Sequence, residues 1–191
     1  MSNQVNKYNN IYQFELIDYQ SRKFSLNLFK NKVMLIVNVA SKCGLSETTY
    51  ERMKKILDIY QNQIILILCP CKQFLNQEFD DIEDIFTFVK QKLGDHCNES
   101  NKPYCTTTNH DFIDKNTNVI LTSAMNVKGQ HIDPLFNYLI SEQGGWFTNS
   151  IKWNFSSFLI DKKGNVIKRY SPLDFPRCDD PYIKKAVYED N

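Results

Sequence analysis

Cysteine is the residue type in this 191-residue chain with the widest capacity for redox chemistry or metal binding. No two of the six cysteines have C-x-x-C spacing, so neither a dithiol redox motif nor a zinc ribbon is indicated. We find no secretory signal, and an even count without one is weak evidence for a disulfide framework. The three histidines stand apart in polar stretches, and we expect no metal and no cofactor. The cysteines are Cys43, Cys69, Cys71, Cys97, Cys105 and Cys178.

Cys43 is the cysteine best placed to react. It follows the apolar stretch "VMLIVNVA" within "NVASKCG" and stands just before a helix-like segment. In open α/β sheets, sites form at the carboxyl ends of buried strands, and the amides at a helix start favour a thiolate. The alternative is a buried structural cysteine, which is a common role for this residue type. Position alone leaves both interpretations open.

Two later stretches carry neutral hydrogen-bond donors. Gln73 and Gln77 lie in the polar stretch "CPCKQFLNQE", and Trp153 and Asn154 stand side by side in "IKWNFSSFLI". Amide and indole N–H groups can donate a hydrogen bond but cannot do acid–base work. Such donors suit the stabilisation of a thiolate and of charge developing on a leaving oxygen. The alternatives are a core aromatic for Trp153 and a turn residue for Asn154.

The apolar pattern predicts which elements position these residues. Lys32–Ala40 and Gln63–Pro70 are typical of strands buried on both faces. Helical spacing of apolar residues between them predicts a helix over 46–60, with Ser46 as its N-cap. The strand–helix–strand order favours two parallel strands joined by a right-handed crossover.

The remaining patterns extend this order to β-α-β-α-β-α-β-β-α, after an N-terminal segment that is a candidate small hairpin. The class is therefore α/β, with a central mixed sheet flanked by helices on both faces. The expected elements are a helix over 80–94 ending at Gly94, a strand at Asn118–Val127, a helix capped by Asp133, a hairpin over 156–171 and a helix capped by Asp180.

Bulk composition bounds the function. With 23 basic and 22 acidic residues the net charge is +1, which gives no electrostatic case for nucleic acid. The 42% of hydrophobic residues suits one soluble domain over residues 1–191, with a polar surface insertion at about 98–117. No apolar run is long enough to span a bilayer, so a cytoplasmic protein is expected.

Three blocks, "NVASKCGL", "PCKQFLNQE" and "KWNFSSFLIDKKGNVIKRYSP", resemble in this order the signatures of the glutathione peroxidase family. The resemblance implies a thioredoxin-like fold and the reduction of hydroperoxides. It implies that Cys43 is the peroxidatic residue and that Gln73, Trp153 and Asn154 complete the catalytic tetrad.

The resemblance also bears on substrate and reductant. The short connection before Trp153 resembles that of monomeric members which accept lipid hydroperoxides, and an exposed Cys43 would fit such substrates. Peripheral contact with membrane lipid is a separate expectation. Thioredoxin-dependent members carry a resolving cysteine where this chain has Lys90. Cys97 or Cys105 is the candidate substitute; otherwise glutathione or another thiol reduces Cys43 directly. Cys71 is expected to serve packing.

The expected cycle begins with oxidation of Cys43 to a sulfenic acid and ends with thiol–disulfide exchange. A peroxiredoxin is rejected, because Ile36 and Ala40 stand where that family needs Pro and Thr. Two alternatives are a redox sensor that relays Cys43 oxidation to a partner protein, and a thioredoxin-fold binding module with an inert Cys43.

Overall fold

Two largely apolar stretches form the centre of a five-stranded sheet in this computed structural model, which describes residues 8, 10–96, 118–143 and 150–189. Every residue of β3 (Val33–Val39) and β4 (Ile64–Pro70) is buried, because helices or other packed segments cover both faces of the sheet. The strand order is β5-β4-β3-β6-β7. β3, β4 and β5 (Val119–Leu121) are parallel, and β6 (Ser157–Ile160) and β7 (Val166–Tyr170) form an antiparallel hairpin beside β3.

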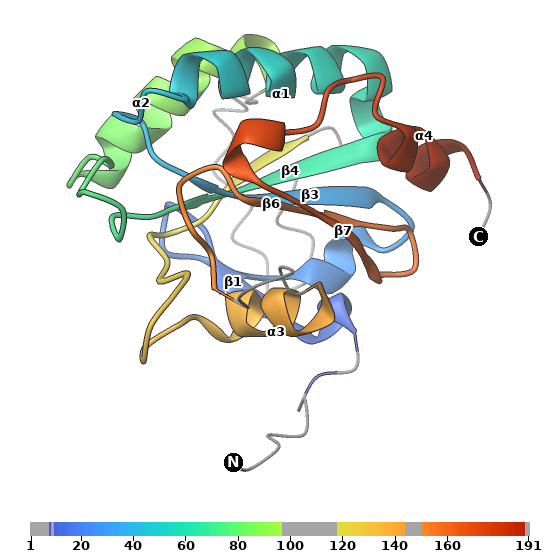
Figure 1. Ribbon diagram of the computed structural model, residues 1–191, viewed down its shortest axis with the longest axis horizontal. Coiled ribbons are helices and arrows are strands. Elements are labelled where there is room, and N and C mark those ends of the chain that lie inside the picture. The colour runs from blue at the N-terminus through green and yellow to red at the C-terminus, as the bar shows by residue number, and fades with distance from the viewer. Residues whose placement is uncertain (1–7, 9, 97–117, 144–149, 190–191) are drawn as a thin grey trace.

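Helices pack against the two faces of this sheet (Figure 1). α1 (Ser46–Tyr60), α2 (Ile82–Leu93) and α4 (Pro181–Tyr188) contribute to one hydrophobic cluster. α3 (Pro134–Glu142) and the β1–β2 hairpin contribute to the other cluster. The mixed α/β sandwich and the element order are therefore confirmed. The hairpin strands are β1 (Glu15–Ile17) and β2 (Lys23–Ser25), and the 3-10 helices are Ile11–Gln13, Leu26–Phe29, Gln61–Gln63, Gly94–His96 and Pro172–Asp174.

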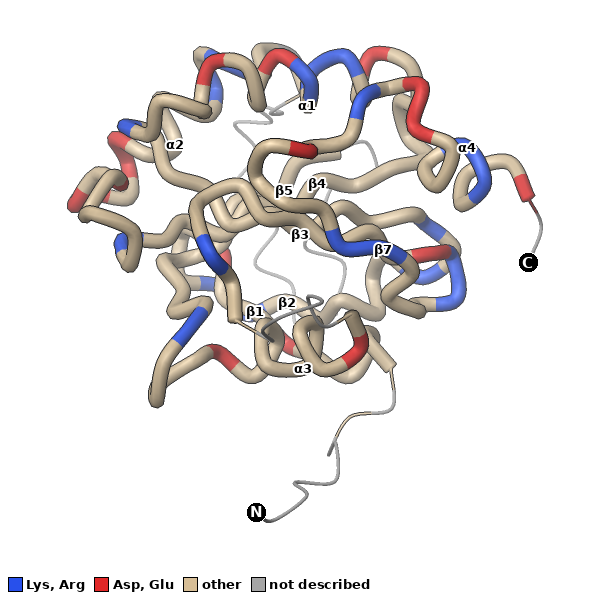
Figure 2. Tube along the Cα trace, viewed as in Figure 1, with Lys and Arg blue, Asp and Glu red and all other residues tan. Residues whose placement is uncertain are grey.

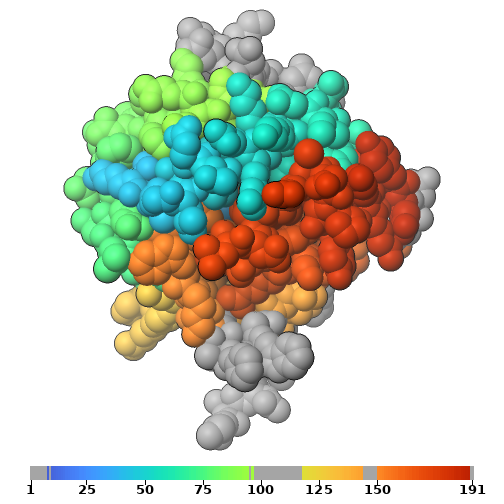
Figure 3. Space-filling model, turned by 45° about the horizontal axis from the view of Figure 1, so that its top comes forward, coloured from blue at the N-terminus to red at the C-terminus, as the bar shows by residue number. Residues whose placement is uncertain are grey.

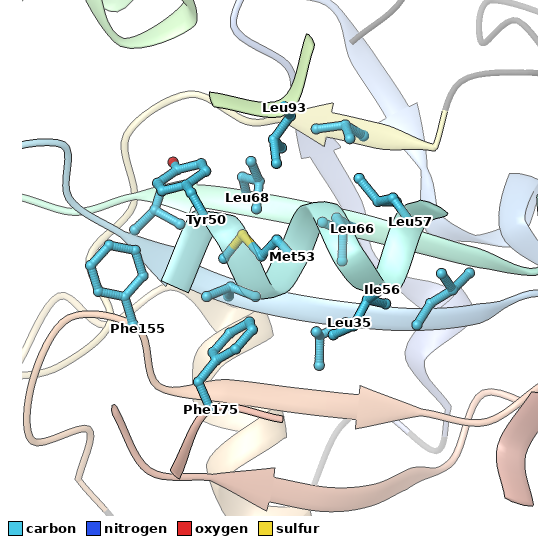
Figure 4. Packing of buried hydrophobic residues seen from close by; sticks show 14 of the residues in the cluster. Leu35, Tyr50, Met53, Ile56, Leu57, Leu66, Leu68, Leu93, Phe155 and Phe175 are labelled. Atoms are coloured by element: carbon cyan, nitrogen blue, oxygen red, sulfur yellow. The ribbon is translucent and has the colours of Figure 1, made fainter. Parts of the chain in front are cut away.

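The packing of α1 on β3 and β4 fixes where the crossover helix begins. Figure 4 shows Met53 and Ile56 of α1 facing the strands, beside Leu35 and Leu66. These four side chains are fully buried. Since α1 cannot slide along the sheet without opening this core, the turn that leads from β3 into α1 is held in place.

Asp133 and Asp180 cap their helices by accepting N–H groups of the first turn, and Gly94 ends α2 at φ 58°, as expected. The N-cap expected at Ser46 is wrong. α1 begins after Leu45, and the N–H of Ser46 instead donates to the Cys43 carbonyl (2.9 Å).

The third strand is also shorter than expected, because it ends at Leu121 rather than Val127. Beyond it, the Thr122 N–H still donates to the Leu68 carbonyl of β4 (3.0 Å), and Thr122 forms an isolated bridge with Asp18. Farther along, the Val127 N–H donates to the Gln73 side chain (2.7 Å). The 98–117 insertion lies outside the described residues. In the described part of the chain, no helix is both long and apolar enough to cross a membrane.

The topology brings three connecting segments to one end of the sheet, which is called the site edge below. β3 and β4 are parallel and end there, and antiparallel β6 begins there. The 40–45, 71–80 and 150–156 segments lie together on the left of Figure 1. Figure 3 shows blue atoms of the first half of the chain against orange and red atoms of its last quarter. We take this edge as the candidate site.

Candidate active site

Cys43 sits in a tight turn between β3 and α1. Its N–H donates to the Ala40 carbonyl (3.3 Å), and its own carbonyl accepts the Ser46 N–H (2.9 Å). Only 5% of Cys43 is exposed, and it belongs to the hydrophobic cluster that α1 and α2 share. The expectation of an exposed Cys43 is therefore wrong, because this cluster closes over most of the side chain.

Trp153 and Asn154 are held at the same edge by Asn38 of β3. The Asn38 side chain donates to the Trp153 carbonyl (3.2 Å), and the Asn38 carbonyl accepts the Phe155 N–H (2.6 Å). Phe155 has a φ of 65°, which is costly for an aromatic residue. Its buried ring packs edge-on against Tyr50, at 6.1 Å between centroids. This turn therefore presents Trp153 and Asn154 in sequence beside the end of β3.

Gln77 links Asn154 to the turn that carries Cys43. The fully buried Asn154 donates its side-chain N–H to Gln77 Oε1 (2.9 Å). The Gln77 carbonyl accepts the Lys42 N–H (2.8 Å). The structure thus brings Gln77 and Asn154 together, and joins Gln77 to Lys42, which directly precedes Cys43 in the chain.

Gln73 is engaged elsewhere. Its Oε1 accepts the N–H groups of Val127 (2.7 Å) and Lys128 (3.0 Å), and its Nε2 donates to the Lys128 carbonyl (2.9 Å). No described contact joins it to Cys43 or Asn154. The described contacts therefore do not bring Gln73 together with the other expected site residues, because its carboxamide binds the 127–128 loop. Of the two glutamines in this turn, Gln77 is the one that contacts another expected site residue.

The turn between the two glutamines has an unusual backbone. Leu75 and Asn76 have φ values of 53° and 52°, and this pair of left-handed residues reverses the chain toward Gln77. Leu75 is 77% exposed. Phe74 is buried and packs on Trp153, with ring centroids 5.7 Å apart. Trp153 therefore combines an aromatic packing contact with a half-buried position at the edge.

Several lysines surround this edge. Lys42 Nζ lies 4.5 Å from the centre of the Phe79 ring, and Lys128 Nζ lies 4.1 Å from that of Phe74. Lys72 pairs with Asp80 at 2.6 Å and lowers the pKa of that exposed carboxyl. Figure 2 shows basic segments on these loops, together with acidic ones.

Sequence reasoning assigned no role to Glu78, a residue that is only 1% exposed. Its Oε1 accepts the N–H groups of Ser41 (3.0 Å) and Phe79 (2.9 Å). Burial raises the pKa of Glu78, and this outweighs the opposite effects of the Ser41 hydroxyl, the two amides and Lys42. The sequence feature that could have indicated Glu78 is a charged residue next to Gln77 in a polar turn. The feature that could have indicated Asn38 is a single amide side chain within an apolar strand.

Two of the other described cysteines are poorly suited to act as nucleophiles. Cys69 and Cys71 are fully buried, and burial raises the pKa of both thiols. This agrees with a packing role for Cys71. Cys178 is half-buried near α4, where its carbonyl accepts the Tyr60 hydroxyl (2.6 Å).

Cys97 and Cys105, the candidate resolving residues, lie outside the described residues. His96, which precedes Cys97, contacts Asp58 at 2.7 Å. Asp58 lies in the last turn of α1, whereas Cys43 precedes its first turn. The described part of the chain therefore leaves the resolving residue open.

Comparison with known proteins decides the family. Residues 11–113 match the family model described as glutathione peroxidase. A relative from Nicotiana tabacum named "Probable phospholipid hydroperoxide glutathione peroxidase" is 39% identical over 188 residues, 98% of each chain. "Glutathione peroxidase 1" from Caenorhabditis elegans is 33% identical, covering 94% of this chain and 97% of the relative. The chain belongs to the glutathione peroxidase family.

Solved structures agree with this assignment. The crystal structure of T. cruzi GPX1 is 26% identical, covers 94% of each chain and superposes with a TM-score of 0.64. A thioredoxin-family thiol:disulfide interchange protein from Chlorobium tepidum, at 15% identity and a TM-score of 0.54, covers 94% of this chain and 96% of its own, and confirms the thioredoxin-like fold. This glutathione peroxidase is thus a thiol-dependent peroxidase that reduces hydroperoxides, and the sensor alternative is not favoured.

Glu78→Gln should change how stability depends on pH. Because burial raises the pKa of Glu78 above the unfolded value of about 4.3, the native state keeps the proton longer than the unfolded state does. This carboxyl therefore stabilises the wild type less as pH rises through that window. We expect the free energy of unfolding of Glu78→Gln, relative to wild type, to rise between pH 4 and 7 in urea titrations. A relative stability that falls with pH would contradict the raised pKa.

Proposed function

We propose that Cys43 is the residue that this peroxidase oxidises. The observation that carries the proposal is the hydrogen bond between Gln77 and Asn154, formed beside the turn that holds Cys43. Together with the bond from the Lys42 N–H to the Gln77 carbonyl, it gathers three distant stretches of chain at one end of the sheet. Cys69 and Cys71 are unsuited, because their buried thiols have raised pKa values.

In the first step, the Cys43 thiolate attacks the terminal oxygen of a hydroperoxide. An S–O bond forms and the O–O bond breaks, so the sulfur is oxidised to a sulfenic acid. The leaving oxygen takes up a proton and departs as an alcohol, or as water when the substrate is hydrogen peroxide. The charge that develops on this oxygen is what nearby N–H donors stabilise.

Trp153, Asn154 and Gln77 are the donors in this proposal, and Gln77 takes the role first expected of Gln73. Gln77 Oε1 accepts a hydrogen bond from Asn154, which orients the carboxamide and leaves its NH₂ group to donate. The Trp153 ring is set by Phe74, and its N–H is the third donor.

In the second step, a thiol attacks the sulfenic acid, an S–S bond forms and water leaves. A second thiol then exchanges with this disulfide and returns Cys43 to the reduced state. Glutathione supplies both thiols if no resolving cysteine exists. If Cys97 or Cys105 attacks first, thioredoxin reduces the resulting intramolecular disulfide.

Single replacements should separate these roles. Cys43→Ser should abolish peroxide consumption, and Trp153→Phe should slow it without unfolding the chain, because the ring stays and only the N–H is lost. Gln77→Ala should lower kcat about a hundredfold, the typical cost of losing one such donor. Gln73→Ala is the matched control in the same turn, and should act mainly through stability.

These rates are measured as thiol-dependent peroxide consumption, beside unfolding curves for each variant. Normal turnover by Cys43→Ser would end the assignment. A loss confined to Gln73→Ala, with Gln77→Ala unaffected, would restore Gln73 to the role first expected of it.

The reductant can be found with Cys97→Ser and Cys105→Ser assayed with thioredoxin and with glutathione. A resolving cysteine predicts that one replacement removes thioredoxin-dependent turnover at least tenfold and leaves the oxidation of Cys43 intact. Unchanged rates for both variants with both reductants would leave direct reduction by an external thiol as the route.

We also propose that the edge around Cys43 contacts anionic membrane lipid. Leu75 and Leu173 are 77% and 83% exposed, and they follow β4 and β7, whose carboxyl ends lie on this edge. Lys42, Lys128 and Lys152 lie on the same side of the sheet, which suits anionic headgroups. Names of relatives such as the Nicotiana tabacum protein refer to phospholipid hydroperoxide, in keeping with such a surface.

Binding to vesicles tests this contact. The double variant Leu75→Ala, Leu173→Ala should bind phosphatidylserine-containing vesicles about tenfold or more weakly in a flotation assay, since it removes the exposed apolar area. Ile59→Ala is the control, because Ile59 is 52% exposed at the far end of α1. Equal losses in both variants, or binding that salt leaves unchanged, would contradict the proposal.

A further inference from the structure

Glu78 joins the two turns that meet at the candidate site. The β3–β4 ladder ends where the Cys71 N–H donates to the Val39 carbonyl (3.0 Å). Beyond it, among the described residues, two hydrogen bonds join the 40–45 turn to the 71–80 turn. One is the bond from the Lys42 N–H to the Gln77 carbonyl, and the other is the bond from the Ser41 N–H to Glu78 Oε1.

The bond between Ser41 and Glu78 lies close in sequence to the proposed reacting groups. Ser41 stands two residues before Cys43, and Glu78 directly follows Gln77. Gln77 in turn holds Asn154. Glu78 Oε1 also accepts the Phe79 N–H. One side chain therefore fixes the position of the turn that carries Cys43 relative to the turn that carries Gln77.

The burial of this group needs a reason. A carboxyl group removed from water is costly unless hydrogen bonds compensate, and only 1% of Glu78 is exposed. Its Oε2 is buried as well and has no hydrogen-bond partner within normal geometry. A neutral side chain of the same length could also accept the N–H groups of Ser41 and Phe79. We therefore infer that the length of the side chain is what the site requires.

We propose that Glu78 is a positioning residue for Cys43, which it holds at the distance from Gln77 and Asn154 that peroxide reduction needs. This rests on the function proposed above, in which Cys43 is oxidised and Gln77 donates. The positioning depends on the length of the side chain and on its acceptor oxygen, and does not depend on its charge.

Three replacements separate reach from charge. Glu78→Gln keeps the length and the acceptor oxygen, and the Ser41 hydroxyl offers an acceptor for the new NH₂. Glu78→Asp keeps the carboxyl but is one methylene shorter, and Glu78→Ala removes the group. We measure the second-order rate constant for oxidation of Cys43 by hydrogen peroxide, on folded protein at a fixed interval below each melting temperature.

We expect Glu78→Gln to react within about threefold of the wild type. Glu78→Asp and Glu78→Ala should react about 10- to 100-fold more slowly, as small misplacements of reacting groups do. If Glu78→Ala fails to fold, the comparison of Asp with Gln still decides.

Asp161 provides the matched control. It is also buried, and its Oδ1 accepts two backbone N–H groups, those of Lys163 (2.9 Å) and Asn165 (2.8 Å). It follows β6, at the end of the sheet opposite Cys43. Asp161→Ala should therefore lose stability without slowing the oxidation of Cys43.

The outcomes are distinct. A wild-type protein whose Cys43 is not oxidised by peroxide defeats the proposed function itself. An oxidised wild type with an equally fast Glu78→Asp and Glu78→Ala overturns the positioning role alone. A slow Glu78→Gln with a fast Glu78→Asp overturns it too, because charge would then be the property that matters.

Discussion

The hydrogen bonds of Asn38 are the constraint on which the site depends. Asn38 lies fully buried in the central strand and makes three hydrogen bonds to the 153–156 turn. Its backbone N–H donates to the Ser156 carbonyl (3.3 Å), and its carbonyl accepts the Phe155 N–H. Its side chain donates to the Trp153 carbonyl. Without them, the turn that contains the left-handed Phe155 would lose its hydrogen bonds to Asn38 of β3. The indole of Trp153 and the amide of Asn154 would then lose their fixed relation to the end of β3.

A second constraint follows from the burial of Cys43. A sulfur that is 5% exposed within an apolar cluster gains little from bulk water when it carries charge. Stabilisation of charge has to come from N–H groups fixed by the protein. This is consistent with the burial of Asn154 and Glu78, and with the hydrogen bonds that hold Gln77, Asn154 and Glu78 in place before any substrate arrives.

The elements were predictable from sequence because their signals are local, whereas the site needed long-range contacts. Apolar runs rich in β-branched residues predicted β3 and β4, and Asp133, Gly94 and Asp180 marked the ends of helices. Two glutamines four residues apart in one polar turn are equivalent by pattern. What separates Gln77 from Gln73 is the reversal at Leu75 and Asn76, and a left-handed leucine has no sequence signal. The burial of Cys43 likewise results from packing by distant residues. The Val127 N–H, at the end first expected for the third strand, is bound by the distant Gln73 side chain.

The most direct test of the account is to identify the cysteine that peroxide oxidises first to a sulfenic acid. The reduced protein is treated with one equivalent of hydrogen peroxide in the presence of dimedone, which traps sulfenic acids. Mass spectrometry of the cysteine-containing peptides then shows which of them carry the dimedone adduct. The account predicts a near-stoichiometric adduct on Cys43 and none on Cys69 or Cys71. An unmodified Cys43 beside an adduct on another cysteine would contradict it.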